Sequence, residues 1–68
     1  MTRVDIEKGL IKSANGANLL GRKDIGLFMG CHGDNKLVRE LIRGLPKING
    51  KYFAKDLSER IFERQKMA

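Results

Sequence analysis

A helix cannot continue through Gly44-Leu45-Pro46, and this break divides the most basic part of the chain in two. Proline lacks the N–H that a helix interior needs and its ring clashes with the preceding turn, which costs about 3 kcal/mol or more. Gly44 and Gly50 would each cost about another 1 kcal/mol inside a helix. Basic residues do recur at every fourth position from Arg43 to Lys55, but a single long basic helix is disfavoured.

The segment before the break predicts a short helix that is N-capped by Asp34 and stops near Arg43. Gly44 follows where a left-handed residue ends a helix, and Leu45 can fold back on the last turn. One stripe of this helix would be apolar, with Leu37, Val38, Leu41 and Ile42. The other face would be charged, with Lys36, Arg39, Glu40 and Arg43.

The segment after the break predicts a β-hairpin. Asn-Gly is the strongest short-range signal of a type I′ turn, and Asn49-Gly50 lies between Ile48 and Tyr52-Phe53. Side chains alternate along a strand, so we expect one of the two rings to pack in the core and the other to lie on the surface. The hairpin would carry Lys47, Asn49 and Lys51. A helix followed by a basic hairpin suggests DNA binding.

The net charge of +6 is concentrated on this helix and hairpin. Residues 1–35 carry five basic and four acidic groups, and residues 56–68 carry three of each. Residues 36–55 carry six basic groups against Glu40 alone. Such a surface is expected of a protein that neutralises phosphates and releases their counterions. The plainer interpretation is a solvated face that keeps the protein soluble.

The composition argues against catalytic and metal chemistry. One Cys and one His allow neither a disulfide framework nor a Cys/His zinc finger. Cys31 and His32 lack further ligands or a general-base partner, so we interpret them as a buried turn cysteine beside a polar histidine. The carboxylates near the basic segment form no convincing acid–base pair, and two of them are expected caps: Asp24, Asp34, Glu40 and Asp56. We therefore expect no enzyme, no cofactor and no metal.

The chain also lacks the apolar segments that direct proteins to membranes. The first ten residues have no apolar core of signal-peptide length, and no run approaches the roughly 20 residues that span a bilayer. Sixty-eight residues make one small domain with a single core. We expect a cytoplasmic protein without membrane contact.

A capping box predicts a first helix over residues 3–13, because Thr2 is followed three residues later by Asp5. A narrow apolar stripe would face inward from it, formed by Ile6, Leu10 and Ile11. Residues 13–18 are small and polar and predict a loop. Leu19-Leu20 would then enter the core, either as an extended pair or as the start of the next helix.

Two more helices complete the expected fold. One covers residues 22–29 between Gly21 and Gly30, and its inward residues would be Ile25, Phe28 and Met29. The other would run from its N-cap Asp56 to about Lys66. Its inward residues would be Leu57, Ile61 and Phe62, and its solvated residues Glu59, Arg60, Glu63 and Arg64. Alternatively, Leu57, Ile61, Phe62 and Gln65 would form a dimer surface.

Residues 19–58 resemble the excisionase-type winged helix-turn-helix domains, relatives of the DNA-binding domain of the mercury-resistance regulator MerR. The matching positions are Leu19-Leu20, Ile25, Met29-Gly30, Leu41-Ile42, Gly44-Leu45-Pro46, Gly50, Tyr52-Phe53 and Asp56-Leu57. The turn at Cys31-His32-Gly33 is longer than is usual in that family, and the helix at residues 3–13 has no counterpart in the minimal domain.

The resemblance implies a mostly α fold with a small β-hairpin. Residues 1–68 would form one winged helix-turn-helix domain with about four helices, a two-stranded wing and an added N-terminal helix at about 3–13. It also implies a small double-stranded DNA-binding protein of a mobile element, plasmid or phage. This protein would act as a recombination directionality factor or a transcriptional regulator, beside a recombinase or another copy of itself on adjacent sites.

The helix and the hairpin would contact different parts of the duplex. The residues expected in the major groove are Asn35, Lys36, Arg39 and Arg43. Those expected along the phosphate backbone or in the minor groove are Lys47, Asn49 and Lys51. The alternative function is a protein-interaction module that docks on a larger DNA-bound partner.

Overall fold

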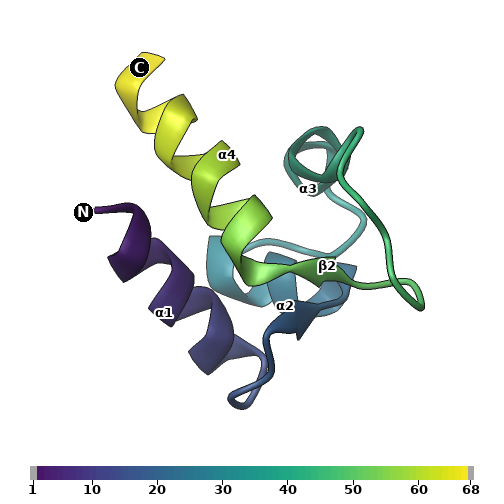
Figure 1. Cartoon of the computed structure of the whole chain (residues 1–68). Helices are drawn as coiled ribbons and strands as arrows, with labels where there is room; N and C mark the ends of the chain where they lie inside the picture. Colours follow the sequence, from purple (N-terminus) through teal and green to yellow (C-terminus); the bar gives the residue numbers. More distant parts are fainter. Residues whose placement is uncertain (1, 68) are drawn as a thin grey trace.

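Four helices and one two-stranded antiparallel sheet form the fold of the computed structural model, which describes residues 2–67 (Figure 1). In chain order the elements are α1 (Arg3–Ser13), β1 (Leu19–Leu20), α2 (Arg22–Met29), α3 (Lys36–Ile42), β2 (Tyr52–Phe53) and α4 (Ala54–Met67). The prediction of a mostly α chain with about four helices is confirmed, whereas the two-stranded sheet joins β1 to β2 and is not the predicted β-hairpin. None of the helices in residues 2–67 has the length and hydropathy needed to cross a bilayer.

α1 begins with the capping box that the sequence predicts. The Asp5 N–H donates to Thr2 Oγ1 over 3.2 Å, and Asp5 Oδ2 accepts from the Thr2 N–H over 3.1 Å. Asp5 Oδ2 also accepts from the Thr2 hydroxyl over 2.9 Å, and the two hydrogen bonds that this carboxylate accepts, first from the Thr2 backbone and then from its side chain, lower the pKa of the exposed Asp5 carboxyl. The chain leaves α1 through left-handed Asn15 and Gly16, so the predicted helix over residues 3–13 and the loop after it are confirmed.

α1 and α4 lie side by side and enclose the core with α2 and α3 (Figure 1). The buried apolar side chains come from every element: Ile6, Leu10, Leu20, Ile25, Val38, Leu41, Ile42, Tyr52, Ala54, Leu57 and Ile61. The alternative in which α4 forms a dimer surface is wrong for Leu57 and Ile61, which are 0% and 8% exposed. α1 covers the apolar face that would have been free.

β1 and β2 pair with each other, so Leu19-Leu20 is the extended pair rather than a helix entry. Leu19 faces Phe53 and Leu20 faces Tyr52 in an antiparallel register. Tyr52 is buried and Phe53 is 39% exposed, as the alternation of side chains predicts.

The hairpin around Asn49-Gly50 is shorter than the predicted two-stranded wing. Both residues have positive φ, 52° and 76°, as a type I′ turn requires. However, the ladder is a single bridge between Ile48 and Lys51, and the sheet partner of β2 is β1. A longer hairpin would set Pro46 opposite Phe53, and proline has no N–H for that position.

Two predicted N-caps are wrong. α3 begins at Lys36 because the Asn35 side chain, and not that of Asp34, caps it by accepting from the Leu37 N–H over 2.8 Å. α4 begins at Ala54 rather than after Asp56, which lies in its first turn. β2 runs directly into this helix, and the Ala54 N–H donates to the Asn18 carbonyl over 2.8 Å.

The turn between α2 and α3 lies directly on α2, and two glycines permit this contact. A Cβ on Gly26 would lie 2.7 Å from the Cys31 carbonyl oxygen, and a Cβ on Gly33 would lie 3.2 Å from the Arg22 carbonyl group. Gly30 ends α2, as predicted, and it has the left-handed conformation. The longer turn is therefore packed against the helix before it, and this packing fixes where α3 begins.

Candidate nucleic-acid interface

The basic side chains of α3 and of the turn after it are exposed. Figure 1 shows α3 and this turn on the side of the molecule opposite α1. All six cationic side chains of residues 36–55 reach solvent: Lys36, Arg39, Arg43, Lys47, Lys51 and Lys55. We call these six residues the basic face.

No carboxylate of residues 2–65 lies within ion-pair distance of a basic-face side chain. Among the residues whose side chains the structure describes, the ion pairs involve other cations: Arg3, Arg22, His32 and Arg64. Glu40, the one acidic residue of the segment, is engaged from α4 by Arg64, with 3.4 Å between Nη2 and Oε2. The positive charge therefore remains available to an anionic ligand.

The predicted major-groove residues differ in how they are held. The Oδ1 atom of the exposed Asn35 accepts the N-cap hydrogen bond of α3. A contact between this atom and a ligand would therefore break the cap. Arg39 donates from Nε to the Asp34 carbonyl over 3.2 Å, which orients its guanidinium group. Lys36 and Arg43 are exposed at the first turn of α3 and just past its end.

The predicted wing residues all lie at the turn. Lys47, Asn49 and Lys51 are exposed, and Asn49 occupies a left-handed position at the tip. The bridge between Ile48 and Lys51 has two N–H···O bonds of 2.9 Å. The tip is thus a defined turn that carries two lysines and no acidic residue.

Arg60 holds the end of α3, a role that its sequence position does not reveal. Its Nη1 atom donates to the Leu41 carbonyl over 3.3 Å and also to the Arg43 carbonyl. The last carbonyls of a helix lack partners within it, and a cation there also interacts favourably with the helix dipole. The expectation that Arg60 is simply solvated is wrong, because its guanidinium group binds these carbonyls. The sequence does not reveal this contact, since the partners lie 17 and 19 residues away.

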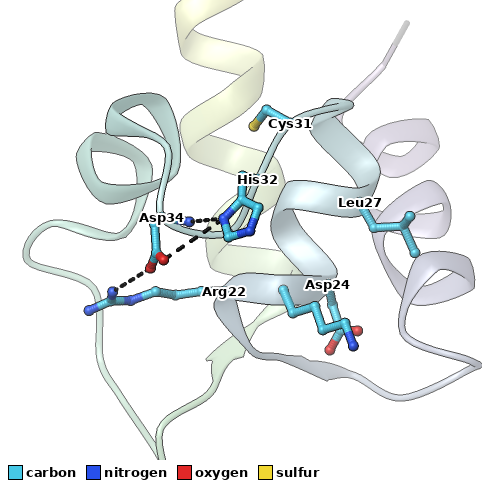
Figure 2. Close-up of a pocket in the computed structure, with 8 residues that line it drawn as sticks. Arg22, Asp24, Leu27, Cys31, His32 and Asp34 are labelled. Carbon is cyan, nitrogen blue, oxygen red and sulfur yellow. Dashed lines mark hydrogen bonds and ion pairs between the residues drawn. The ribbon is translucent and has the colours of Figure 1, made fainter.

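An open depression of about 520 Å³ lies between the start of α2 and the turn before α3. Figure 2 shows Arg22 and His32 both directed at Asp34. Arg22 Nη1 lies 3.7 Å from Asp34 Oδ1, and His32 Nδ1 accepts from the Asp34 N–H over 3.3 Å. The fold thus brings Arg22, which the charge count places outside the basic segment, beside the start of α3.

The same depression includes Cys31, but no metal-binding group is formed there. Cys31 is half-buried, rather than buried as expected, and His32 is exposed. Among residues 2–65, no three His, Cys, Asp or Glu side chains gather where they could hold a metal ion.

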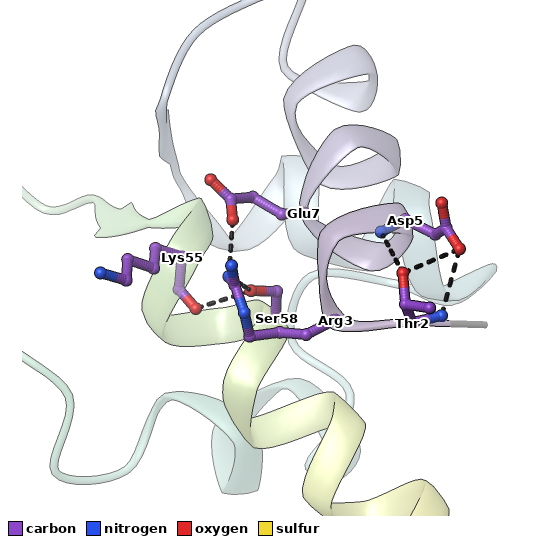
Figure 3. Close-up of polar contacts among 6 residues, drawn as sticks. All are labelled: Thr2, Arg3, Asp5, Glu7, Lys55 and Ser58. Carbon is purple, nitrogen blue, oxygen red and sulfur yellow. Dashed lines mark hydrogen bonds and ion pairs between the residues drawn. The ribbon is translucent and has the colours of Figure 1, made fainter.

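A polar contact fixes the start of α4 to α1 (Figure 3). Buried Ser58 donates to the Lys55 carbonyl over 2.7 Å and accepts from Arg3 Nη1 over 3.1 Å. Arg3 also pairs with Glu7 at 2.6 Å on its own helix. The carbonyl group of Lys55, the last residue of the basic face, is therefore bound by Ser58, which is itself held by Arg3 of α1.

The candidate site is a cationic surface on a supported helix and a tight turn. Its chemistry suits an extended polyanion, since it offers many separate positive charges without a cavity around them. No family model, curated protein or solved structure matches the chain.

Proposed function

We propose that this protein binds double-stranded DNA as a winged helix-turn-helix domain. In this proposal α2 and α3 are the two helices of the motif, and residues 47–51 are a short wing. The observation that carries the proposal is the basic face, in which all six cations are exposed and none is paired to a carboxylate within the described residues.

The support of α3 favours insertion into the major groove. Its first turn follows the packed turn on α2, and its last carbonyls are held by Arg60. A helix fixed at both ends can present Arg39 to base edges and Lys36 and Arg43 to phosphates. In the same arrangement Lys47 and Lys51 would reach phosphates beside the groove.

The resemblance to excisionase-type domains favours a role on mobile DNA. The protein would act there as a recombination directionality factor or as a transcriptional regulator. A recombinase, or a second copy on an adjacent site, would be its partner on the duplex.

A salt titration tests the proposal. Binding of the full chain to a fluorescein-labelled duplex of arbitrary sequence is measured by anisotropy from low to moderate salt. If four to six cations contact phosphates, the slope of log K against log salt is about −4 to −5. A module that only docks on another protein would bind the bare duplex weakly or not at all, and that result would refute the proposal.

A further inference from the structure

The turn carries two large apolar side chains that the core does not use. Among the described residues, the exposed large apolar side chains are Val4, Leu27, Ile48 and Phe53. Ile48 is 41% exposed and Phe53 39% exposed, and neither belongs to the core cluster. Single exposed apolar residues are ordinary on a protein surface, but these two share one face of the same short segment.

The backbone geometry sets them in a row. Ile48 and Lys51 exchange both backbone hydrogen bonds at 2.9 Å, so their side chains stand on the same side of the ribbon. Side chains alternate along a strand, so Phe53 lies on that side as well, while Tyr52 is buried on the other. We call Ile48, Lys51 and Phe53 the outward strip.

The setting of the strip is cationic throughout. No acidic residue occurs in the sequence between Glu40 and Asp56, whereas this segment contains Lys47, Lys51 and Lys55, all of them exposed. Ile48 is β-branched, so its side chain has few rotamers and keeps its direction. Apolar side chains flanked by lysine or arginine are what proteins insert into the DNA minor groove, which is about 6 Å wide and too narrow for a helix.

We infer that Ile48 enters the minor groove and makes the protein prefer A·T-rich duplex, an inference that rests on the proposed DNA binding. Lys47 and Lys51 would contact the phosphates on either side. A·T pairs leave the floor of the minor groove free of the guanine amino group, and TA steps unstack easily. Both properties favour contact between an apolar side chain and the base edges.

Two duplexes of equal length test this inference, one A·T-rich with several TA steps and one G·C-rich. Wild type should bind the first about tenfold more tightly, and Ile48→Ala should reduce this ratio to about twofold or less. The G·C-rich affinity and the salt slope should not change. Val4→Ala is the matched control, since it shortens an equally exposed apolar side chain on α1 and should keep the wild-type ratio.

A second variant separates groove contact from charge. Ile48→Lys adds a cation, so a tip that acts only through charge would bind both duplexes more tightly and keep the ratio. If Ile48 contacts the groove floor, the ratio falls in this variant too. Circular dichroism of each variant verifies that the helices are retained.

Four results overturn the inference, and they differ in what else they affect. An unchanged ratio in Ile48→Ala, or no preference in wild type, removes the minor-groove contact and leaves DNA binding intact. Absence of salt-dependent binding by wild type to either duplex removes the proposed function as well. If wild type self-associates without DNA in sedimentation experiments and Ile48→Ala abolishes this, the strip is a protein contact instead.

Discussion

At the scale of single residues, Arg39 is expected to contribute to sequence discrimination and Lys36 to affinity for any duplex. Arg39 is oriented by its bond to the Asp34 carbonyl, and an oriented guanidinium group can bind a guanine edge with two hydrogen bonds. Arg39→Ala should then remove about 1–3 kcal/mol of discrimination at one base pair. Lys36→Ala should weaken all sequences alike and reduce the salt slope by about 1. Titrations on a panel of single-base variants of a duplex would distinguish the two effects.

Lys12 supplies the control for this pair. It is an exposed lysine near the end of α1, outside the basic face. Lys12→Ala removes the same charge as Lys36→Ala and should change binding little. Equal losses for all three variants would mean that the net charge of the molecule, and not the position of the side chains, determines affinity.

The wrong cap at Asp34 illustrates what local sequence signals leave undetermined. Asp and Asn are about equally good N-caps, so Asp34-Asn35 gives no preference for either position. The choice is made by packing, because Gly33 lies against the Arg22 backbone and Asp34 then faces the Arg22 side chain. Both contacts are with Arg22, the first residue of α2, and no signal in the sequence around Asp34 predicts them.

At the scale of elements, the wing can be separated from the helices by Gly50→Val. Gly50 has a φ of 76°, which a β-branched residue adopts only with strain. The substitution should distort the turn, lower affinity for duplex DNA and leave the circular dichroism of the helices almost unchanged. If instead helicity rises and binding is retained, residues 43–55 form a continuous basic helix when bound.

Gly16→Val is a matched control for this turn. Gly16 also has a positive φ, 89°, and an added Cβ would meet no atom within 4 Å, but it lies in the loop after α1. The strain should be comparable, whereas DNA affinity should stay at the wild-type value. A similar loss of affinity in both variants would attribute the effect to general destabilisation.

The helices were predictable where their signals are local, and the pairings between distant segments were not. The capping box at Thr2, the glycine that ends α2 and the Asn-Gly turn all act within a few residues, and each is observed where predicted. The β1–β2 pairing and the contact of Arg60 with the end of α3 join residues far apart in sequence. Periodicity cannot reveal such contacts. The exposure of the predicted binding residues followed from the pattern, while the use of the Asn35 side chain as a cap did not.

At the scale of the whole molecule, α1 is predicted to be part of the core and not an appendage. Leu10 on α1 is fully buried, as is Leu41 on α3. Leu10→Ala and Leu41→Ala should each destabilise the domain by about 2–5 kcal/mol. A domain of this size has roughly 5 kcal/mol of stability, so either variant should approach unfolding. Urea denaturation followed by circular dichroism gives both values.

Val4→Ala shows whether this effect comes from burial. Val4 lies on the same helix but is 46% exposed, so its truncation should change stability by less than about 0.5 kcal/mol. A small loss for Leu10→Ala together with a large one for Leu41→Ala would mean that α1 can detach while the other helices stay folded.

The packing of α1 on α4 has a consequence for how the chain folds. The bond between Arg3 and Ser58 joins residues 55 positions apart, so it closes a loop that includes most of the protein. Closing such a long loop costs chain entropy before the contacts between its ends form, and contacts of this range slow folding. α2, the turn and α3 can form from neighbouring residues, whereas the core closes only when the first and last helices meet. The amides of α1 and α4 should therefore exchange with solvent as one cooperative unit.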